Sequence, residues 1–423
     1  MISYGSDNNL DMSFSKADIA RLTVSSCLFL LCFSPAGAST ATAQGGETSL
    51  SVPDLSETSV TTSNGVRIES KDGLFSMRLG FRMQSRVSYD DMDGNSSTQD
   101  LVEMQTRRIR LRLNGHVLGP QLKYALQLGF SRGDQDWDTV AFPNVLRDAN
   151  VTWEWAGGHS MIFGLRKLPG NRQRVNSSGS LEFVDRALTN ATFNLDRDTG
   201  VQSWHKFGAD QPAWLKLALT SGEGRNQKNS GTGLSTTARV EWLPAGSFKD
   251  DGDYFEGDLS FEPEARYSLG AVYNYNGSNS RTSGQNGSLL SGNATRNIET
   301  WILDGLWKRQ GWSFSFEAFQ RNAESPIVNS NQAIYAGRGL NLQVSHTFAS
   351  NWAPALRWSI ITPESVLRDV LDERTQATVG LTRYIKKHSI KVQGDVTHES
   401  VAERIGQASM KNMYYRLQLE VGI

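Results

Sequence analysis

The sequence predicts an all-β fold, a transmembrane antiparallel β-barrel of about 16 strands with one loop folded into its lumen. Three observations lead to this prediction. Apolar and polar residues alternate along most of the chain, short connections alternate with long polar ones, and arginines keep to one face of the strands that carry them.

Composition excludes two classes of protein. The 423 residues include 43 Lys and Arg against 44 Asp and Glu, and 38% are hydrophobic. Such a balanced charge excludes a nucleic-acid binder that works through bulk charge. No stretch approaches the roughly 18 consecutive apolar residues of a spanning helix, so a helical membrane protein is excluded as well.

A secretory signal peptide is predicted over residues 1–43. Lys16 and Arg21 precede an apolar run, 22–33, and small residues follow that end in an A-x-A site at 41–43. A basic flank, a short apolar run and this cleavage site together are typical of an export signal. We expect cleavage after about Ala43.

Both cysteines, Cys27 and Cys32, lie inside this predicted signal peptide. The exported chain therefore has no thiol for a disulfide, a thiolate metal site or a cysteine nucleophile. Residues 44–73, rich in Ser and Thr, are expected to form a periplasmic N-terminal extension. Residues 74–423 are expected to form the barrel in the bacterial outer membrane.

The strands are predicted from a period of two. In the run 74–89, Phe75 and Met77 share one parity, and Arg78 and Arg82 the other. Successive side chains of a strand point to opposite faces, whereas a helix repeats every three to four residues. The further runs are 108–117, 122–130, 146–155, 161–167, 201–206, 214–221, 236–243, 264–274, 297–308, 312–322, 337–348, 352–361, 375–385, 389–398 and 413–423.

The connections differ in length. Residues 309–311, 349–351 and 386–388 are short, whereas 250–261 and 276–294 are long and polar. Outer-membrane barrels carry short turns at one rim and long loops at the other. Tryptophans near the strand ends are expected to form interfacial girdles: Trp153, Trp155, Trp242, Trp301, Trp307, Trp312, Trp352 and Trp358.

Charge placement decides between a barrel and a soluble sandwich. Arg108, Arg110 and Arg112 alternate with three apolar residues. On a lipid-facing surface each arginine would cost about 2–4 kcal/mol near the midplane. A dry sandwich core would tolerate three stacked arginines even less. The arginines are therefore expected to face a polar, water-filled lumen.

Residues 168–199 break the alternation and are too long for a turn, so we expect them to form a constriction loop inside the lumen. Basic residues gather in and beside this loop: Arg166, Lys167, Arg172, Arg174, Arg186 and Arg197. Four acids accompany them: Glu182, Asp185, Asp196 and Asp198.

Four segments around this loop resemble a known family. They are LRDANVTWEW from Leu146, GLRKLP over 164–169, DRAL over 185–188 and RDTG over 197–200. Their order and spacing are similar to those of the phosphate-selective porin O and P family. The resemblance implies a trimeric, sixteen-stranded outer-membrane porin in which lumen arginines and lysines guide anions. The chain departs from the family at Gly170, where Phe is frequent, and in its four loop acids.

An arginine ladder gives a physical reason for anion guidance. Alternate residues of a strand lie about 6.6–6.8 Å apart, which offers an anion successive weak sites. The expected ladder consists of Arg78, Arg82 and Arg86 on one strand and Arg108, Arg110 and Arg112 on the next. The alternative is that these arginines pair with Glu103, Glu154 or Glu182 and merely fill a polar lumen.

Enzymatic patterns are missing. None of the six histidines has H-x-x-x-H spacing or a Gly-flanked serine beside it, so neither a catalytic site nor a metal site is predicted. Asp90, Asp91 and Asp93 resemble part of a calcium loop, but Ser96 and Val102 stand where that motif needs Gly and Glu. A solvated turn is the preferred interpretation. We expect no enzyme activity and no cofactor.

The sequence thus predicts a passive outer-membrane porin for small anions, with phosphate or polyphosphate as the expected substrate. Its expected partners are inorganic anions, outer-membrane lipid and lipopolysaccharide, and two further copies in a homotrimer, with no nucleic acid. The alternatives are a general-diffusion porin without anion preference and an exported β-sandwich or adhesion protein.

Overall fold

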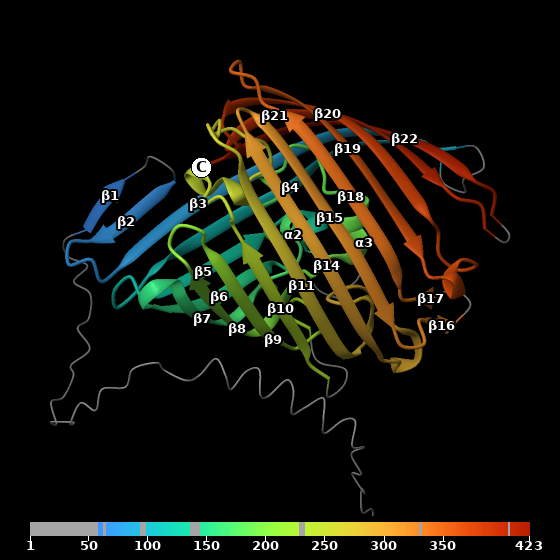
Figure 1. The fold of residues 1–423 in the computed structure, drawn as a ribbon, viewed down its shortest axis with the longest axis horizontal. Coiled ribbons are helices and arrows are strands. Elements are labelled where there is room, and N and C mark those ends of the chain that lie inside the picture. Colours follow the sequence, from blue (N-terminus) through green and yellow to red (C-terminus); the bar gives the residue numbers. More distant parts are fainter. Residues whose placement is uncertain are drawn as a thin grey trace, which may run out of the picture. The chain divides into compact units, whose positions relative to one another are not determined.

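The computed structural model describes residues 58–61, 65–93, 99–135, 144–227, 233–329, 332–404 and 407–423. The predicted signal peptide and both cysteines lie outside these residues. In the part of the chain that is described, 18 strands form one antiparallel sheet, and 16 of them close into a barrel (Figure 1). This confirms the predicted fold class and excludes the β-sandwich.

The barrel strands follow one another around the wall in chain order. They are β3 (Ser76–Asp91), β4 (Leu101–His116), β5 (Leu122–Gly129), β6 (Leu146–Trp155), β7 (His159–Lys167), β8 (Arg197–Phe207), β9 (Ala213–Thr220), β10 (Ser235–Trp242), β11 (Arg266–Asn279), β14 (Arg296–Arg309), β15 (Trp312–Ala323), β18 (Gly337–His346), β19 (Trp352–Pro363), β20 (Arg374–Lys386), β21 (Ile390–Val401) and β22 (Met410–Gly422).

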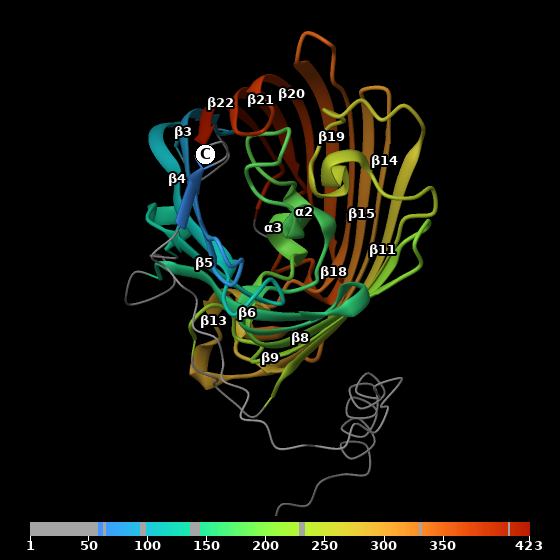
Figure 2. The same ribbon diagram turned by 90° about the vertical axis from the view of Figure 1, so that its left-hand side faces the viewer.

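The remaining elements are short. Two small hairpins lie in connections, β12 (Arg281–Ser283) with β13 (Asn286–Leu289) and β16 (Ile327–Asn329) with β17 (Gln332–Ala333). The α-helices are α2 (Arg172–Val175) and α3 (Leu188–Phe193), both inside the barrel wall (Figure 2). None of the described helices is long and apolar enough to cross a membrane.

The barrel closes between its first and last strands. β22 pairs with β3 from Met413 opposite Asp91 to Gly422 opposite Arg82. Beyond the end of β22, the same edge of β3 pairs with β2 (Val66–Ser70), which forms a hairpin with β1 (Thr58–Thr61). The N-terminal hairpin therefore pairs with the part of this edge of β3 that β22 leaves unpaired.

The second barrel strand begins earlier than the sequence predicts. β4 starts at Leu101 rather than at residue 108, and its pairing with β3 shifts between Gln84 and Ser85. Arg107 is the extra residue at this bulge, since its neighbours on either side are both paired. A bulge exchanges the inward and outward directions of the residues that precede it. The alternation of apolar and polar residues therefore breaks in the sequence, although the strand continues.

One long connection lies at the rim opposite to the predicted one. Consecutive connections of an antiparallel barrel alternate between the two rims. Residues 243–265, between β10 and β11, therefore share a rim with the short turns at 310–311 and 387–389. The prediction that 250–261 belongs to the long-loop rim, together with 276–294, is wrong for 250–261. The structure shows instead a second long segment that enters the lumen from the short-turn rim.

The outer face carries the apolar residues, as predicted. Six of the eight girdle tryptophans are exposed there: Trp153, Trp242, Trp301, Trp312, Trp352 and Trp358. Leucines such as Leu303, Leu356 and Leu417 are exposed between them. Lipid would cover this face in a membrane.

Candidate functional site

The loop between β7 and β8, residues 168–196, crosses the lumen and carries α2 and α3 (Figure 2). The last three residues of the predicted loop, 197–199, belong to strand β8. The loop has few side-chain caps at its helix ends, and its shape is set by contacts with the wall.

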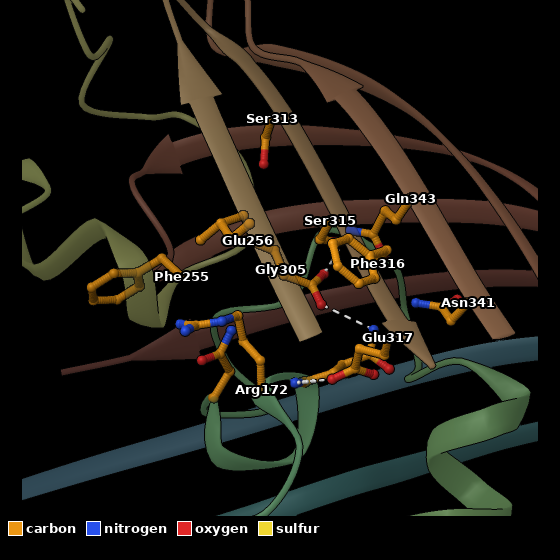
Figure 3. Close-up of a pocket in the computed structure, with 13 residues that line it drawn as sticks. Arg172, Phe255, Glu256, Gly305, Ser313, Ser315, Phe316, Glu317, Asn341 and Gln343 are labelled. Atoms are coloured by element: carbon orange, nitrogen blue, oxygen red, sulfur yellow. Dashed lines mark hydrogen bonds between the residues drawn. The ribbon is translucent and has the colours of Figure 1, made fainter. Parts of the chain in front are cut away.

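The segment 243–265 meets this loop from the opposite rim. The Glu256 backbone N–H donates to the Ser180 carbonyl at 2.9 Å, and the Glu182 backbone N–H donates to the Glu256 carboxylate at 2.9 Å. Lys308 on β14 holds the segment in place through the carbonyls of Gly252 and Phe255, at 2.7 and 2.9 Å. Glu256 consequently lies deep in the lumen, beside Gln343 of β18 (Figure 3).

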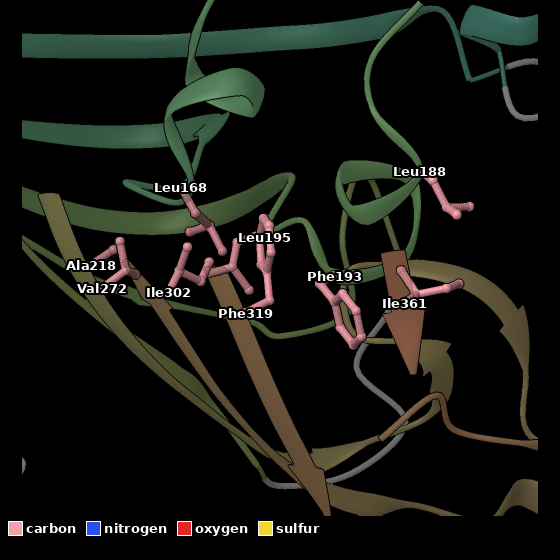
Figure 4. Close-up of a cluster of buried hydrophobic side chains, with 9 residues drawn as sticks. All are labelled: Leu168, Leu188, Phe193, Leu195, Ala218, Val272, Ile302, Phe319 and Ile361. Carbon is pink, nitrogen blue, oxygen red and sulfur yellow. The ribbon is translucent and has the colours of Figure 1, made fainter. Parts of the chain in front are cut away.

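An apolar core fixes the loop on one side of the barrel. Four loop residues, Leu168, Leu188, Phe193 and Leu195, are buried against the inner face of five wall strands (Figure 4). The wall contributes Ala218, Val272, Ile302, Phe319 and Ile361. This part of the lumen is therefore dry, which corrects the prediction of an interior that is polar throughout. The apolar loop needs an apolar surface to pack against, because leaving these side chains in water would cost about 1.5–3 kcal/mol each.

Exposure separates two sides of the lumen. Inward-facing side chains of β9 to β21 are buried beneath the loop: Lys216, Arg239, Glu241, Asp304, Glu317, Arg321, Asn341, Gln343, Arg357 and Lys391. On β4 to β7, by contrast, Arg112 is exposed, and Gln127, Asp148 and Arg166 are half-buried. We call the surface formed by these four residues the accessible face; Arg108, Arg110 and Arg147 on the same strands are buried. Water and ions reach the lumen wall here.

Basic side chains on the buried side hold the loop through its backbone. Lys391 donates to the Leu181 carbonyl at 2.6 Å, and Arg357 to the Asp185 carbonyl at 2.8 Å. Arg321 donates to the carbonyls of Thr192 and Phe193, both at 3.0 Å. These three wall residues were missed in the sequence, since each partner lies more than a hundred positions away.

The arginines of the predicted ladder lie on two neighbouring, paired strands, β3 and β4. Arg82 pairs in register with Arg110, and Gln84 with Arg108. Arg82 and Arg110 both donate to the Ser178 hydroxyl of the loop, at 2.8 and 3.1 Å. The two strands thus bring four of the predicted arginines together at the loop: Arg82, Arg86, Arg108 and Arg110.

Carboxylates neutralise much of this ladder. Arg110 makes two hydrogen bonds of 2.6 Å to Asp134, and Arg86 lies 2.6 Å from Asp185. Arg108 lies 3.4 Å from the same Asp185. The sequence alternative foresaw pairing, but with Glu103, Glu154 or Glu182. Asp134 and Asp185 are the partners that the fold provides, and Glu154 instead pairs with Lys123.

The two remaining ladder arginines are exposed. Arg78 is opposite Asn114 and Arg67, near the N-terminal hairpin and away from the loop. Arg112 is opposite Gln127, which in turn is opposite Asp148. Of the predicted ladder, Arg112 is the member on the accessible face.

Three of the predicted loop residues are engaged in ion pairs. Arg172 is buried and binds Glu241 at 2.8 Å, which takes it out of contact with water. Arg174 donates to Asp196 at 2.8 Å. Arg197 donates to both oxygens of Asp148, at 2.9 and 3.0 Å. Arg172 therefore anchors the loop to β10, Arg174 braces the loop internally, and Arg197 joins strands β8 and β6.

The other three have no carboxylate partner within the described residues. The Arg166 guanidinium lies 4.3 Å from the centre of the Trp204 ring. Lys167 donates to the carbonyls of Val175 and Asn176, both at 2.9 Å. Arg186 donates to the Gln173 and Asn176 carbonyls at 2.8 and 2.9 Å. A carbonyl satisfies a donor without cancelling its charge, and none of the three has an ion-pair partner among the described residues, although Asp148 attracts Arg166 and Lys167 from a greater distance.

Other basic residues lie near Arg186. Burial lowers the pKa of this guanidinium, and the nearby charges of Arg174 and Arg110 lower it further. Around the accessible face, the basic residues are Arg112, Arg166, Lys167, Arg174, Arg186 and Arg197, and the carboxylates that pair with them are Asp148 and Asp196. Of these six bases, Arg174 and Arg197 pair with the two carboxylates, and the other four form no ion pair among the described residues.

Comparison with known proteins gives a family and a fold. The model of the family "phosphate-selective porin O and P" matches residues 77–338. The outer membrane channel DcaP of Acinetobacter baumannii is 12% identical and superposes with a TM-score of 0.55, over 85% of this chain and 100% of that chain. An anion-selective porin from Comamonas acidovorans is 13% identical, with a TM-score of 0.51 over 82% and 99% of the two chains.

A third structure, OprB of Pseudomonas putida, is 10% identical, with a TM-score of 0.52 over 82% of this chain and 94% of that chain. At these identities the likeness to solved structures establishes the fold only. No curated protein matches the chain by sequence.

Proposed function

Because the chain belongs to the phosphate-selective porin O and P family, whose members are outer-membrane channels, we propose that it conducts small anions passively along the accessible face of its lumen. The observation that carries this proposal is that Arg112, Arg166, Lys167 and Arg186 form no ion pair among the described residues, beside a loop that fills the opposite side. An ion that crosses the barrel must pass these groups.

Magnitudes support a selectivity of this origin. Two unit charges 4 Å apart interact by about 4 kcal/mol at an effective dielectric constant of 20. Salt screens such interactions beyond about 8 Å under physiological conditions. Charges at the outer rims therefore contribute little, whereas charges beside a constriction act on every ion that passes. Arg166 and Arg112 are close enough to one another to interact electrostatically.

Phosphate or polyphosphate is the anion that we propose as the physiological substrate. The family name supports phosphate. A guanidinium can bind two phosphate oxygens at once, and the two arginines on one face, exposed Arg112 and half-buried Arg166, suit a multiply charged oxyanion better than chloride. A homotrimer, contacts with lipopolysaccharide, and cleavage of the export signal after about Ala43 are part of the same proposal.

A general-diffusion porin without anion preference is the second candidate. The extensive pairing of arginines with Asp134, Asp148, Asp185 and Asp196 favours it, since each pair removes a charge from the lumen. The two candidates differ in the net charge that a passing ion meets.

Ion selectivity of the reconstituted channel tests the proposal. Purified protein is inserted into a planar bilayer between two KCl solutions of different concentration, and the reversal potential is measured. We expect the sign of an anion-selective channel and a chloride current that falls when phosphate is added. A reversal potential near zero would support general diffusion, and the sign of a cation-selective channel would contradict both the selectivity and the substrate.

A further inference from the structure

A small cavity lies where the loop, the segment 243–265 and the barrel wall meet (Figure 3). Its volume is about 20 Å³, enough for one water molecule or one small ion. Its lining includes Asn176 of the loop, Glu256 of the segment 243–265, Glu317 of β15, and Asn341 and Gln343 of β18.

Oxygen atoms without partners line this cavity. Glu317 Oε2, Asn341 Oδ1 and Gln343 Oε1 are buried and accept no hydrogen bond from any described residue. The three residues are only 3%, 1% and 4% exposed. A buried polar atom without a partner costs about 1–3 kcal/mol, and more if it is charged. Three such acceptors around one cavity indicate that it holds a ligand that binds to oxygen atoms.

The cavity also carries negative charge that no base neutralises directly. Glu256 accepts hydrogen bonds only from neutral groups, the Gln173 and Gln343 amides, both at 3.1 Å, and one backbone N–H. Glu317 accepts from the Gln173 backbone N–H at 2.7 Å and from the Asn171 amide at 3.0 Å. Among the described residues, no Lys or Arg forms an ion pair with either carboxylate.

Arg172 is the one basic residue in the described lining, and its charge is used elsewhere. Its guanidinium lies 2.8 Å from Glu241 and 3.4 Å from Asp304, two carboxylates outside the cavity. It also donates to the Asp253 carbonyl at 2.7 Å. Glu256 and Glu317 are therefore left without a direct ion-pair partner among the described residues, although Lys391, Arg357 and Arg186 interact with Glu256 electrostatically from a greater distance.

We propose that this cavity binds one calcium ion, held by the carboxylates of Glu256 and Glu317 and by the amide oxygens of Asn341 and Gln343. Calcium takes several oxygen ligands, both carboxylate and amide, in flexible geometry. Magnesium needs near-ideal octahedral geometry and usually keeps several waters, for which a cavity of about 20 Å³ has no room.

The proposed ligand set differs from the usual clusters of carboxylates, histidines and cysteines. No group of three or more His, Cys, Asp or Glu residues in the described part of the chain could hold a metal. Two of the four proposed ligands are amides, and the four ligands come from three separate elements. The ion would join the segment 243–265 to β15 and β18, next to the loop residue Asn176. This inference does not depend on anion selectivity.

Calcium binding to the purified channel tests the inference. Protein free of lipopolysaccharide is treated with a chelator, desalted in detergent, and titrated with CaCl₂ in a calorimeter, with MgCl₂ in a parallel titration. We expect one saturable calcium site per chain, a higher midpoint of thermal unfolding with calcium, and binding of magnesium at least about tenfold weaker. Absence of saturable calcium binding to the wild-type protein would overturn the proposal.

Variants then locate the site. Glu317→Gln and Asn341→Leu should each weaken calcium binding at least about tenfold, since each removes a ligand. Glu399→Gln serves as the matched control, because Glu399 is an equally buried lumen carboxylate whose contacts are with Arg374, Gln376 and Tyr414. A heat-modifiable electrophoretic band reports that each barrel has folded. Calcium affinity that is unchanged in both site variants, or lost in the control, would contradict the assigned ligands.

Discussion

The Asp185 carboxylate lies 2.6 Å from the Arg86 guanidinium, and this contact joins the loop to the first barrel strand. Arg108 lies 3.4 Å from the same carboxylate. Burial alone would raise the pKa of Asp185, yet Arg86 and Arg108 hold it well below its usual range. One loop acid thus keeps its charge and removes two arginines from the set that can attract a passing anion.

Removing bases of the accessible face should reduce anion selectivity. In the double variant Arg112→Ala/Arg166→Ala, each lost charge at roughly 8 Å in water is worth about 0.5 kcal/mol, so the chloride-to-potassium permeability ratio should fall about fivefold. Reversal potentials in a KCl gradient measure this ratio. Arg309→Ala is the control, because Arg309 is exposed at the end of β14 and points away from the lumen. An unchanged ratio in the double variant would assign Arg112 and Arg166 to packing.

Removing the charge of Asp185 should have the opposite effect. Asp185→Asn frees the charges of Arg86 and Arg108, so anion selectivity should increase. It also weakens hydrogen bonds to charged groups, which are worth about 1.5–3 kcal/mol, so the midpoint of thermal unfolding should fall. The two measurements together distinguish this variant from one that merely unfolds. Lower selectivity would show that the pair shapes the passage rather than masks its charge.

Acid should loosen the loop. Asp185 and Asp196 both have a pKa well below the usual range; burial opposes this shift, and neighbouring arginines produce it. Because the pKa is depressed in the folded state, the contribution of these groups to stability is complete above about pH 4 and is lost as the pH falls through the folded value. Thermal unfolding between pH 7 and 2 should show this decline.

Asp185→Asn should flatten that acid dependence, since one of the two groups no longer titrates. Asp369→Asn, a change at an exposed residue at the barrel rim, should leave it as steep as in the wild type. Identical profiles for all three proteins would assign the acid sensitivity to other carboxylates.

Loss of a wall donor should free part of the loop. Lys391 is fully buried and donates to the Leu181 carbonyl. Lys391→Met removes the charged donor and leaves that carbonyl only the Gln393 amide, at 3.0 Å. The loss should cost about 1.5–3 kcal/mol, and single-channel current noise should increase as the loop moves. Lys386→Met, at an exposed position at the end of β20, is the control. Equal noise in both variants would show that the remaining donors hold the loop without Lys391.

Loss of the loop core should widen the channel. Phe193 is completely buried and stacks on Phe319 with ring centres 5.7 Å apart. Phe193→Ala should cost about 3–5 kcal/mol and increase the single-channel conductance as the loop leaves the wall. Phe207→Ala changes an exposed outer-face ring and should alter neither quantity to this extent. A destabilised channel of unchanged conductance would place the constriction elsewhere.

The wall was predictable because alternation is a local signal. Every barrel strand coincides with a predicted run, and the main error, the start of β4, lies at the Arg107 bulge, where parity changes. The dry half of the lumen was not predictable. Ile302 lies between Trp301 and Leu303 in an apolar run, so its inward direction leaves no mark in the sequence.

The site was predictable only in its residue types. The sequence identified the arginines of the loop and the ladder arginines of strands β3 and β4, but it missed Arg321 and Arg357 on the opposite wall, and it could not show which arginines form ion pairs. Whether an arginine is neutralised depends on its carboxylate partner. Asp134, the partner of Arg110, is brought to it only by the folded chain. The segment 243–265 was recognised as a long loop but not as part of the lumen, because the contact of Glu256 with Glu182 requires the whole barrel.

The position of β2 has a consequence for how the barrel is completed. Gly65, with φ of +93°, begins β2 where Ile423 ends the row of β22, and a side chain there would collide with the Leu79 carbonyl. β2 precedes β3 and is joined to it by a short turn, so this pairing is local and can form before the distant β22 arrives. A bare strand edge invites pairing with a second molecule. The chain thus shields part of its own seam during biogenesis, and the last strand has only the remaining edge, from Phe81 to Asp91, to find.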